Sequence, residues 1–419
     1  MSESPVTPPA DAAESVEAPP SSKMAASTRS TLLGAMFLMA TSAIGPGFIT
    51  QTTAFTVQLG VAFAFAIAVS IVVDVALQMN VWRVIGVTGR RAQELGNLVF
   101  PGLGWAMAGL LLLGGLVFNV GNVSGAGLGT DAMFGLDPRI GGAVSAAIAI
   151  GVFLSRRAGV AIDRIVVALG LVMISLTSYI AVSSGPPVGT ALKNVVLPEE
   201  VSFLAITTLI GGTIGGYIVY AGAHRLLDSG LSGPENVSAI TRGSIVGILI
   251  TGVMRIVLFL AILGVVVGGA ELDPSNQAAS AFEQAAGEVG LRVFGIVLWA
   301  ASITSVIGAS YTTVSFITSR TKTSERTRTA LVCGFIAFTT LAFLFVGTAP
   351  VTLLIFAGAF NGLLLPFGIA VLLWVASRRA DLLRGYVYPK WLLVAGWTAW
   401  LLTLYLAVRS VRPVIELFG

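Results

Sequence analysis

The sequence predicts an all-α integral membrane protein, an inverted repeat of five plus five helices with an eleventh helix added. Of its 419 residues, 55% are hydrophobic and only 11% are charged, whereas soluble domains average about 25% charged residues. Apolar runs of about 20 residues, each long enough to cross a bilayer as a helix, recur along the chain. Two of these runs, the first and the sixth, are interrupted by glycine and proline near their midpoints.

The elements follow in order from the polar N-terminus. Residues 1–27 are rich in Ser, Pro, Ala and Glu, which predicts a disordered cytoplasmic tail. It lacks the basic and apolar regions of a signal peptide. We expect a ten-helix transporter core over 28–376, followed by helix 11 and the C-terminus over 377–419. The predicted spans are residues 31–58, 61–84, 103–130, 139–155, 160–184, 201–224, 243–268, 291–318, 329–347, 351–376 and 388–409. A short amphipathic helix is expected on the outer surface at 276–287.

The basic residues predict how the chain lies in the membrane. With the N-terminus inside, 18 of the 24 Lys and Arg fall in inner segments, five fall in outer segments and one lies inside a span. Inner loops of membrane proteins carry the excess of Lys and Arg. We therefore expect a multi-pass protein of the cell (plasma or inner) membrane with a cytoplasmic N-terminus and an extracytoplasmic C-terminus.

Composition and motifs exclude several classes of protein. The chain has one cysteine, Cys333, and one histidine, His224, so it can form neither an internal disulfide nor a Cys or His metal cluster. It has no phosphate-binding loop and no hydrolase or metalloprotease motif, and we expect neither an enzyme nor a cofactor. Because its basic residues lie in short loops and not on one solvated face, we expect no nucleic-acid partner.

The two interrupted spans predict a substrate site. Gly45-Pro46-Gly47 lies near the middle of the first span, and residues 211–216 include four glycines in the sixth. Unwound backbone at membrane depth survives only where it lines a cavity or is buried in protein, and breaks in matching spans of two halves are typical of transporters with inverted repeats. The candidate substrate-binding residues are Gly45, Gly47, Phe48, Gln51, Gly212, Thr213, Gly215, Tyr217 and Asn361.

Ionisable residues inside spans are candidates for proton movement or gating. Asp74 and Arg255 lie deep in the second and seventh spans, where each is disfavoured by roughly 2.5–3.5 kcal/mol. They are interpreted either as an ion pair between two helices or as a proton or substrate relay. At the inner end of the sixth span, His224 and Asp228 share one helix face. They form either an inner gate or proton acceptor, or simply a charged helix end.

Several motifs carry a resemblance to a known family. They are the break at 45–48, the Gly-Val-Thr-Gly turn at 86–89 followed by Glu94, the sixth-span segment, and Leu365-Pro366 in span ten. On these residues the chain resembles the NRAMP divalent-metal transporters from about residue 31 to 375. The resemblance implies the LeuT-type fold, eleven or twelve helices, and proton-coupled uptake of metal.

The metal ligands that the resemblance implies are replaced in this sequence. The family's first-span Asp-Pro-Gly-Asn falls on Gly45-Pro46-Gly47-Phe48, and its sixth-span Met-Pro-His falls on Gly215-Gly216-Tyr217. The tenth-span Gln falls on Gly358. Two third-span acids linked to proton movement fall on Asn119 and Asn122, which makes these two asparagines gating candidates. The break is kept, but the side chains that hold a metal are not.

The altered site favours a different substrate. Helix segments that restart after Gly47 and Gly216 present N–H groups with roughly half a positive charge, and such ends hold carboxylates in broken-helix transporters. The rings of Phe48 and Tyr217 favour an organic solute. We expect a secondary transporter of a small anionic or zwitterionic solute, coupled to H⁺ or Na⁺. A divalent-metal (Mg²⁺ or Mn²⁺) transporter and a non-transporting receptor or subunit are the alternatives, and the sequence does not predict the oligomeric state.

Overall fold

The computed structural model describes residues 44–228, 230–318 and 323–418, and within them the chain is helical and contains no strand. The predicted tail over 1–27 lies outside the described residues, as does the first part of the first span. The longer helices are α2 Pro46–Leu59, α3 Phe63–Thr88, α4 Ala92–Val99, α5 Leu103–Phe134, α6 Pro138–Leu154, α7 Arg156–Ser183, α8 Val188–Val196, α9 Phe203–Thr213, α10 Ile218–Asp228, α11 Val237–Val267, α12 Gln277–Ser315, α13 Glu325–Val346, α14 Pro350–Arg378 and α15 Lys390–Ile415.

Within the described ranges, eight helical stretches are long and apolar enough to cross a membrane, or nine when a bent pair is counted as one span. The eleven predicted spans all fall on these stretches or on α6. Two features explain why eight or nine stretches are counted within the described residues where the sequence predicts eleven spans. The short turn η1 (Gly60–Ala62) joins α2 to α3, so the two form one stretch, and α6 is an apolar helix of only 17 residues. The bent pair consists of residues 168–183 of α7 and α8, with an angle of 102° between them.

Helix α12 joins two elements that the sequence separates. The predicted amphipathic helix at 276–287 and the eighth span form one helix, Gln277–Ser315, with a kink at Gly287, where φ is +63°. Ahead of the kink, Phe282 is buried and Glu283 is exposed, so this segment has the predicted apolar and polar faces. The kink lets one helix serve as both a surface segment and a span.

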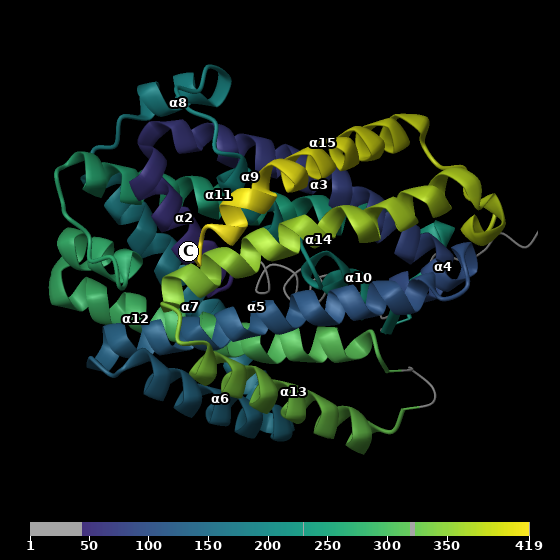
Figure 1. The fold of residues 1–419 in the computed structure, drawn as a ribbon, viewed down its shortest axis with the longest axis horizontal. Coiled ribbons are helices and arrows are strands. Elements are labelled where there is room, and N and C mark those ends of the chain that lie inside the picture. Colours follow the sequence, from purple (N-terminus) through teal and green to yellow (C-terminus); the bar gives the residue numbers. More distant parts are fainter. Residues whose placement is uncertain (1–43, 229, 319–322, 419) are drawn as a thin grey trace, which may run out of the picture.

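The centre of the bundle is helix α5. Figure 1 shows α5 running through the middle of the molecule, and it packs against α12, α14 and α6. Small residues allow this close approach. A side chain added at Gly129 would meet the Trp299 backbone nitrogen of α12 at 2.7 Å, and one added at Gly121 would touch Leu354 of α14. Close packing of this kind holds membrane helices together where burial from water cannot.

Helix α15, the predicted addition, packs on α14, α9 and α3. The Thr207 and Ser410 hydroxyls are hydrogen-bonded at 2.7 Å, and the Asn80 amide donates to the Leu392 carbonyl at 3.1 Å. The Trp400 indole donates to the carbonyl of Pro366 at 2.8 Å. These bonds hold α15 against the helices that frame the break in the sixth span.

Candidate substrate site at two helix breaks

The first break lies at Gly45. This residue is extended, with φ −88° and ψ −173°, and helix α2 begins directly after it at Pro46. A Cβ at Gly45 would lie 2.8 Å from the Ser305 hydroxyl of α12 and 3.8 Å from Asn122 Oδ1 of α5. The opening turn of α2 has no intrahelical acceptors for its N–H groups. Because Gly45 has no side chain, the backbone at the break lies directly against α5 and α12.

The second break separates α9, which ends at Thr213, from α10, which begins at Ile218. Gly216 has φ +54°, a left-handed conformation that favours glycine. A Cβ there would meet the Asn361 side-chain oxygen of α14 at 2.0 Å. The predicted interruption of the sixth span is therefore confirmed, and glycine at position 216 is needed both for the turn and for the fit against α14.

Gln51 fills the space between the two breaks. Its side chain, fully buried, donates from Nε2 to the Leu354 carbonyl of α14 at 2.7 Å. Added Cβ atoms at Gly212 and Gly358 would each lie 2.4 Å from it. Its Oε1 has no hydrogen-bond partner in the part of the chain that the structure describes. The Gln51 amide thus stands at the centre of the site with one free acceptor.

Other predicted polar residues border the same region. Asn361 donates to the carbonyls of Gly114 and Ala357 at 3.0 and 2.8 Å, which turns its oxygen toward Gly216. The Tyr217 hydroxyl lies near the Asn122 side chain but has no hydrogen-bond partner among the described residues, and the Tyr217 ring packs edge-on against Phe118. Both residues are buried.

Asn119 lies apart from the breaks. Its amide donates to the Ser310 hydroxyl of α12 at 3.1 Å and to the Thr339 hydroxyl of α13 at 2.9 Å. These bonds give Asn119 a packing role between three helices. Of the two third-span asparagines, Asn122 is the one that adjoins the breaks.

Arg255 of α11 reaches the first break. Its guanidinium carbon lies 4.6 Å from the centroid of the Phe48 ring, which belongs to the first turn of α2. The side chain is 1% exposed, and its Nε and Nη2 have no hydrogen-bond partner among the described residues. A guanidinium has five N–H donors and stays charged. Stacking on Phe48 supports its apolar face and leaves in-plane donors available for an acceptor.

Asp74 of α3 faces Arg255 and the second break. The Arg255 guanidinium and the Thr213 side chain at the end of α9 are near enough to act on its charge, while the Thr213 hydroxyl donates its hydrogen bond to the Leu209 carbonyl at 2.8 Å. Asp74 Oδ1 nevertheless has no hydrogen-bond partner in the described ranges. The two charges are close enough to act on each other, but the unpartnered atoms on both sides do not fit the simple interpretation of a closed ion pair that joins two helices.

The C-terminal end of the sixth span, formed by α10, lines a polar cavity of about 250 Å³. Its walls come from α10 and α12 and include His224, Asp228, Tyr311 and Ser315. His224 is buried, with Nδ1 3.4 Å from the Ser315 hydroxyl. The two residues predicted here thus line one cavity.

Arg91, the N-cap residue of α4, links α4 to α10 and α12. It forms a 2.9 Å ion pair with Asp228 of α10 and donates to the Ser315 carbonyl of α12 at 2.9 Å. In the sequence, Arg91 is only one of many basic residues that are predicted to lie inside. No local pattern could have found this bond, because its partners are more than 130 positions away in the sequence.

Arg91→Ala is expected to destabilise the protein by about 1.5–3 kcal/mol, because hydrogen bonds to charged groups contribute about this much. Thermal unfolding of the purified protein in detergent measures the effect. Arg412→Ala is the control, since Arg412 forms a 2.7 Å pair with Glu416 on the exposed end of α15. Its melting temperature should match that of the wild type. An equal change of melting temperature in Arg91→Ala and Arg412→Ala would contradict the role of Arg91 in linking α4, α10 and α12.

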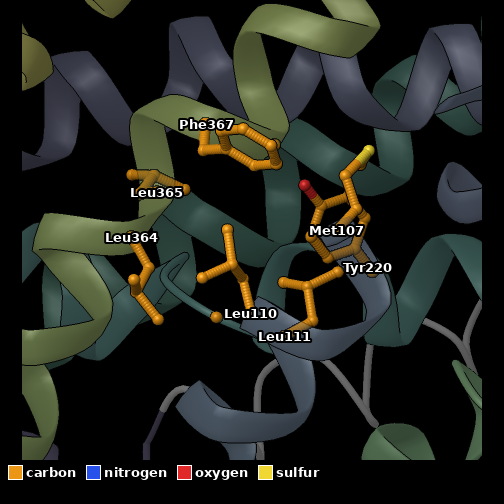
Figure 2. A pocket seen from close by; sticks show the side chains of 9 residues that line it. Met107, Leu110, Leu111, Tyr220, Leu364, Leu365 and Phe367 are labelled. Carbon is orange, nitrogen blue, oxygen red and sulfur yellow. The ribbon is translucent and has the colours of Figure 1, made fainter. Parts of the chain in front are cut away.

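A second pocket opens sideways between α5, α10 and α14. Figure 2 shows its lining of Met107, Phe367 and leucines, with the Tyr220 hydroxyl as the polar group among the labelled side chains. It reaches Gly216 but holds only about 10 Å³ of open volume, room for about one water molecule. The pocket lacks charge, and we assign it no part in substrate binding.

The donor atoms at the breaks are oxygens and nitrogens of amides, hydroxyls and backbone, with one carboxylate and one guanidinium nearby. Within the described ranges, no three side chains of His, Cys, Asp or Glu gather in a group that could hold a metal ion. Two broken helices with a polar centre are nonetheless the frame of a transporter site. A family model, natural resistance-associated macrophage protein-like, matches residues 36–412. The chain belongs to the NRAMP family.

Relatives of this NRAMP protein cover most of its length. The chain is 51% identical to the uncharacterized membrane protein YcsG of Bacillus subtilis over 367 residues, which cover 88% of this chain and 90% of YcsG. It is 46% identical to an uncharacterized membrane protein of Haemophilus influenzae over 390 residues, which cover 93% and 98% of the two chains.

Solved transporter structures share the fold. A manganese transporter of Eremococcus coleocola, in complex with an aromatic bis-isothiourea substituted compound, has a TM-score of 0.74 at 18% identity, over 97% of this chain and 91% of that one. MhsT in complex with L-phenylalanine has a TM-score of 0.65 at 15% identity, over 92% and 98%. The predicted transporter fold is therefore confirmed, and within the described residues the sixth helix is broken and α2 begins directly after Gly45. At these identities the likeness concerns the fold alone.

Proposed function

We propose that this NRAMP-family protein is a secondary active transporter of a small anionic or zwitterionic organic solute, such as a carboxylate, driven by an H⁺ or Na⁺ gradient. It would act in the cell membrane, with the N-terminus in the cytoplasm and the C-terminus outside. The resident groups at the breaks would contact the solute directly, without a cofactor.

The Arg255 guanidinium carries the proposal. A buried arginine with two unpartnered nitrogens, stacked on Phe48 at the first break, is costly in a membrane unless an anion or a polar group meets it. Carboxylates match a guanidinium because two parallel N–H groups can bind the two oxygens. An anionic solute at the start of α2 would therefore satisfy the donors that the protein leaves open.

The surrounding groups support the same class of substrate. The opening turn of α2 adds partial positive charge where α2 restarts. The free Gln51 Oε1 and the Asn361 oxygen can accept hydrogen bonds from a hydroxyl or an ammonium group, which extends the class to zwitterions. The Phe48 and Tyr217 rings offer apolar contact to the carbon skeleton.

A divalent metal ion is the competing substrate, favoured by the manganese transporters of the same fold. Such ions need several oxygen ligands, usually with one or two carboxylates, and softer metals prefer sulfur and imidazole. At the breaks, Gly45, Phe48, Gly215 and Tyr217 stand where the family's ligands do, and a buried arginine lies beside them. Asp74 is the one carboxylate nearby, and Arg255, which acts on it electrostatically, adds a positive charge that repels a dication and attracts an anion.

A ligand screen of the purified full chain tests the proposal. Calorimetry and thermal shift would compare pyruvate, L-lactate, succinate, L-alanine and L-proline with Mn²⁺ and Mg²⁺, because a ligand of the folded state raises the melting temperature. We expect saturable binding of at least one organic acid and none of either metal. Saturable Mn²⁺ binding and uptake, lost in Gly45→Ala or Thr213→Ala, would overturn the proposal. A chain that binds none of these compounds would favour a non-transporting receptor or subunit.

A further inference from the structure

Two buried opposite charges adjoin both helix breaks without saturating each other. Asp74 and Arg255 are each 1% exposed and interact electrostatically. Asp74 Oδ1 and Arg255 Nε and Nη2 nevertheless have no hydrogen-bond partner in the ranges that the structure describes. A closed buried ion pair would be expected to satisfy such atoms, because leaving them open is strongly unfavourable. Asp74 and Arg255 can therefore each still form hydrogen bonds with a third group.

Few charged or polar side chains act on Asp74. Arg255 of α11 is the charged side chain that acts on it, and Thr213 of α9 is its polar neighbour. Helices α2 and α9 carry no charged or titratable side chain. The charged groups on the other helices packed against α3 lie toward helix ends. They are His224, Arg225 and Asp228 of α10, Arg242 of α11, Lys193 of α8, Arg378 of α14, Lys390, Arg409 and Arg412 of α15, Glu235 of the short helix Pro234–Asn236, and Asp381 of the short helix Ala380–Leu383. The tyrosines on these helices are Tyr220 of α10 and Tyr405 of α15.

We infer that Asp74 carries the proton that this transporter couples to its solute, with Arg255 as the link between them; the inference rests on the function proposed above. A carboxylate bound to Arg255 would place a second negative charge beside Asp74 in a medium that screens charge poorly. A proton on Asp74 removes the repulsion and leaves one anion facing one cation. Solute and proton therefore bind together and favour each other.

The charge balance gives a measurable signature. For a monocarboxylate, one proton on Asp74 and one anion on Arg255 cross the membrane together and add no net charge. A pH gradient should drive this transport, and a membrane potential should leave it unchanged. Exchange of labelled for unlabelled solute requires no net proton movement and should survive when position 74 cannot titrate.

The experiment uses the full chain in proteoliposomes with ¹⁴C-labelled pyruvate, L-lactate and L-proline as probes. Uptake is measured with and without an alkaline interior, and with and without a K⁺ and valinomycin potential. A pH dye inside the vesicles reports proton entry. The variants are Asp74→Asn, Asp74→Glu and, as a matched control acid in another span, Asp131→Asn. Asp131 interacts with Asn276 at the far end of α5.

We expect the pH gradient to stimulate wild-type monocarboxylate uptake at least tenfold, with no response to potential. Asp74→Asn should lose the stimulation but keep exchange, while Asp74→Glu and Asp131→Asn should keep both. Gradient-driven uptake by Asp74→Asn would overturn the inference and leave the proposed function standing. Potential-driven, pH-independent uptake by the wild type would also overturn it, even if the Asp74→Asn variant did not fold. Absence of carboxylate binding in the wild type would instead contradict the proposed function.

Discussion

Arg255→Gln is expected to weaken binding of the organic anion by at least about 30-fold, equivalent to about 2 kcal/mol, because truncating one partner of a buried charge pair costs 2–5 kcal/mol. The substitution keeps hydrogen-bond donors but removes the positive charge beside Phe48. Calorimetry with the carboxylates that bind the wild type measures the loss. Arg255→Lys should recover part of the affinity, since it restores the charge without the planar fork.

The matched control is Arg409→Gln. Arg409 also stacks on a phenylalanine, with its guanidinium carbon 4.9 Å from the Phe203 centroid, but it lies exposed on α15. We expect unchanged affinity in this variant. The double variant Asp74→Asn with Arg255→Gln separates binding from stability, because it removes both buried charges. It should fold more stably than Arg255→Gln alone and still fail to bind. Wild-type affinity in Arg255→Gln would show that the arginine is a structural residue.

Gly211→Ala is expected to destabilise the protein by about 1–3 kcal/mol and to abolish transport, because overpacking a close helix contact forces backbone shifts. A Cβ at this position would lie 2.0 Å from the Gly358 carbonyl oxygen and 2.3 Å from the Gly362 nitrogen of α14. Both atoms are backbone, so α9 and α14 would have to separate. That separation would displace the break at 214–217 from Asn361. Thermal unfolding and carboxylate uptake measure the two effects.

Gly109→Ala provides the comparison within a membrane helix. A Cβ there meets nothing within 4 Å, so the variant should be at least as stable as the wild type. A small and equal loss of stability in Gly211→Ala and Gly109→Ala would mean that the contact between α9 and α14 tolerates a methyl group. The substitution at position 211 would then have no special consequence for the site.

The sequence alone predicted the fold through properties that are local and periodic. Apolar runs of bilayer length mark helices wherever they occur, and all eleven predicted spans coincide with helices in the described ranges. Pro46 and the glycines at 211–216 marked the two breaks, because these residue types weaken helices in any context. The bend at Gly60 and the kink at Gly287 altered the number and bounds of the elements, since such joints depend on the neighbouring helices.

The candidate site was predicted only in part. Gly45, Gln51 and Asn361 were named as candidates because they lie in or beside the breaks or the family's motifs, and the structure places them around the two breaks. That Gln51 occupies the centre of the site depends on its bond to the Leu354 carbonyl, 303 positions away. Asn119 was grouped with the gating residues by its alignment, and that role stays a prediction; its bonds to Ser310 and Thr339, which join α5 to α12 and α13, could not be read from the sequence.

The sequence by itself determined that this protein is a bundle of membrane helices with helix-breaking residues in two spans, because composition, hydrophobic length and helix-breaking residues act within a few turns of chain. Only the tertiary structure decided what surrounds the breaks. Arg255 stacked on Phe48 and Asp74 beside Thr213 join helices far apart in the sequence. Such contacts depend on which helix faces pack together, which no local pattern specifies.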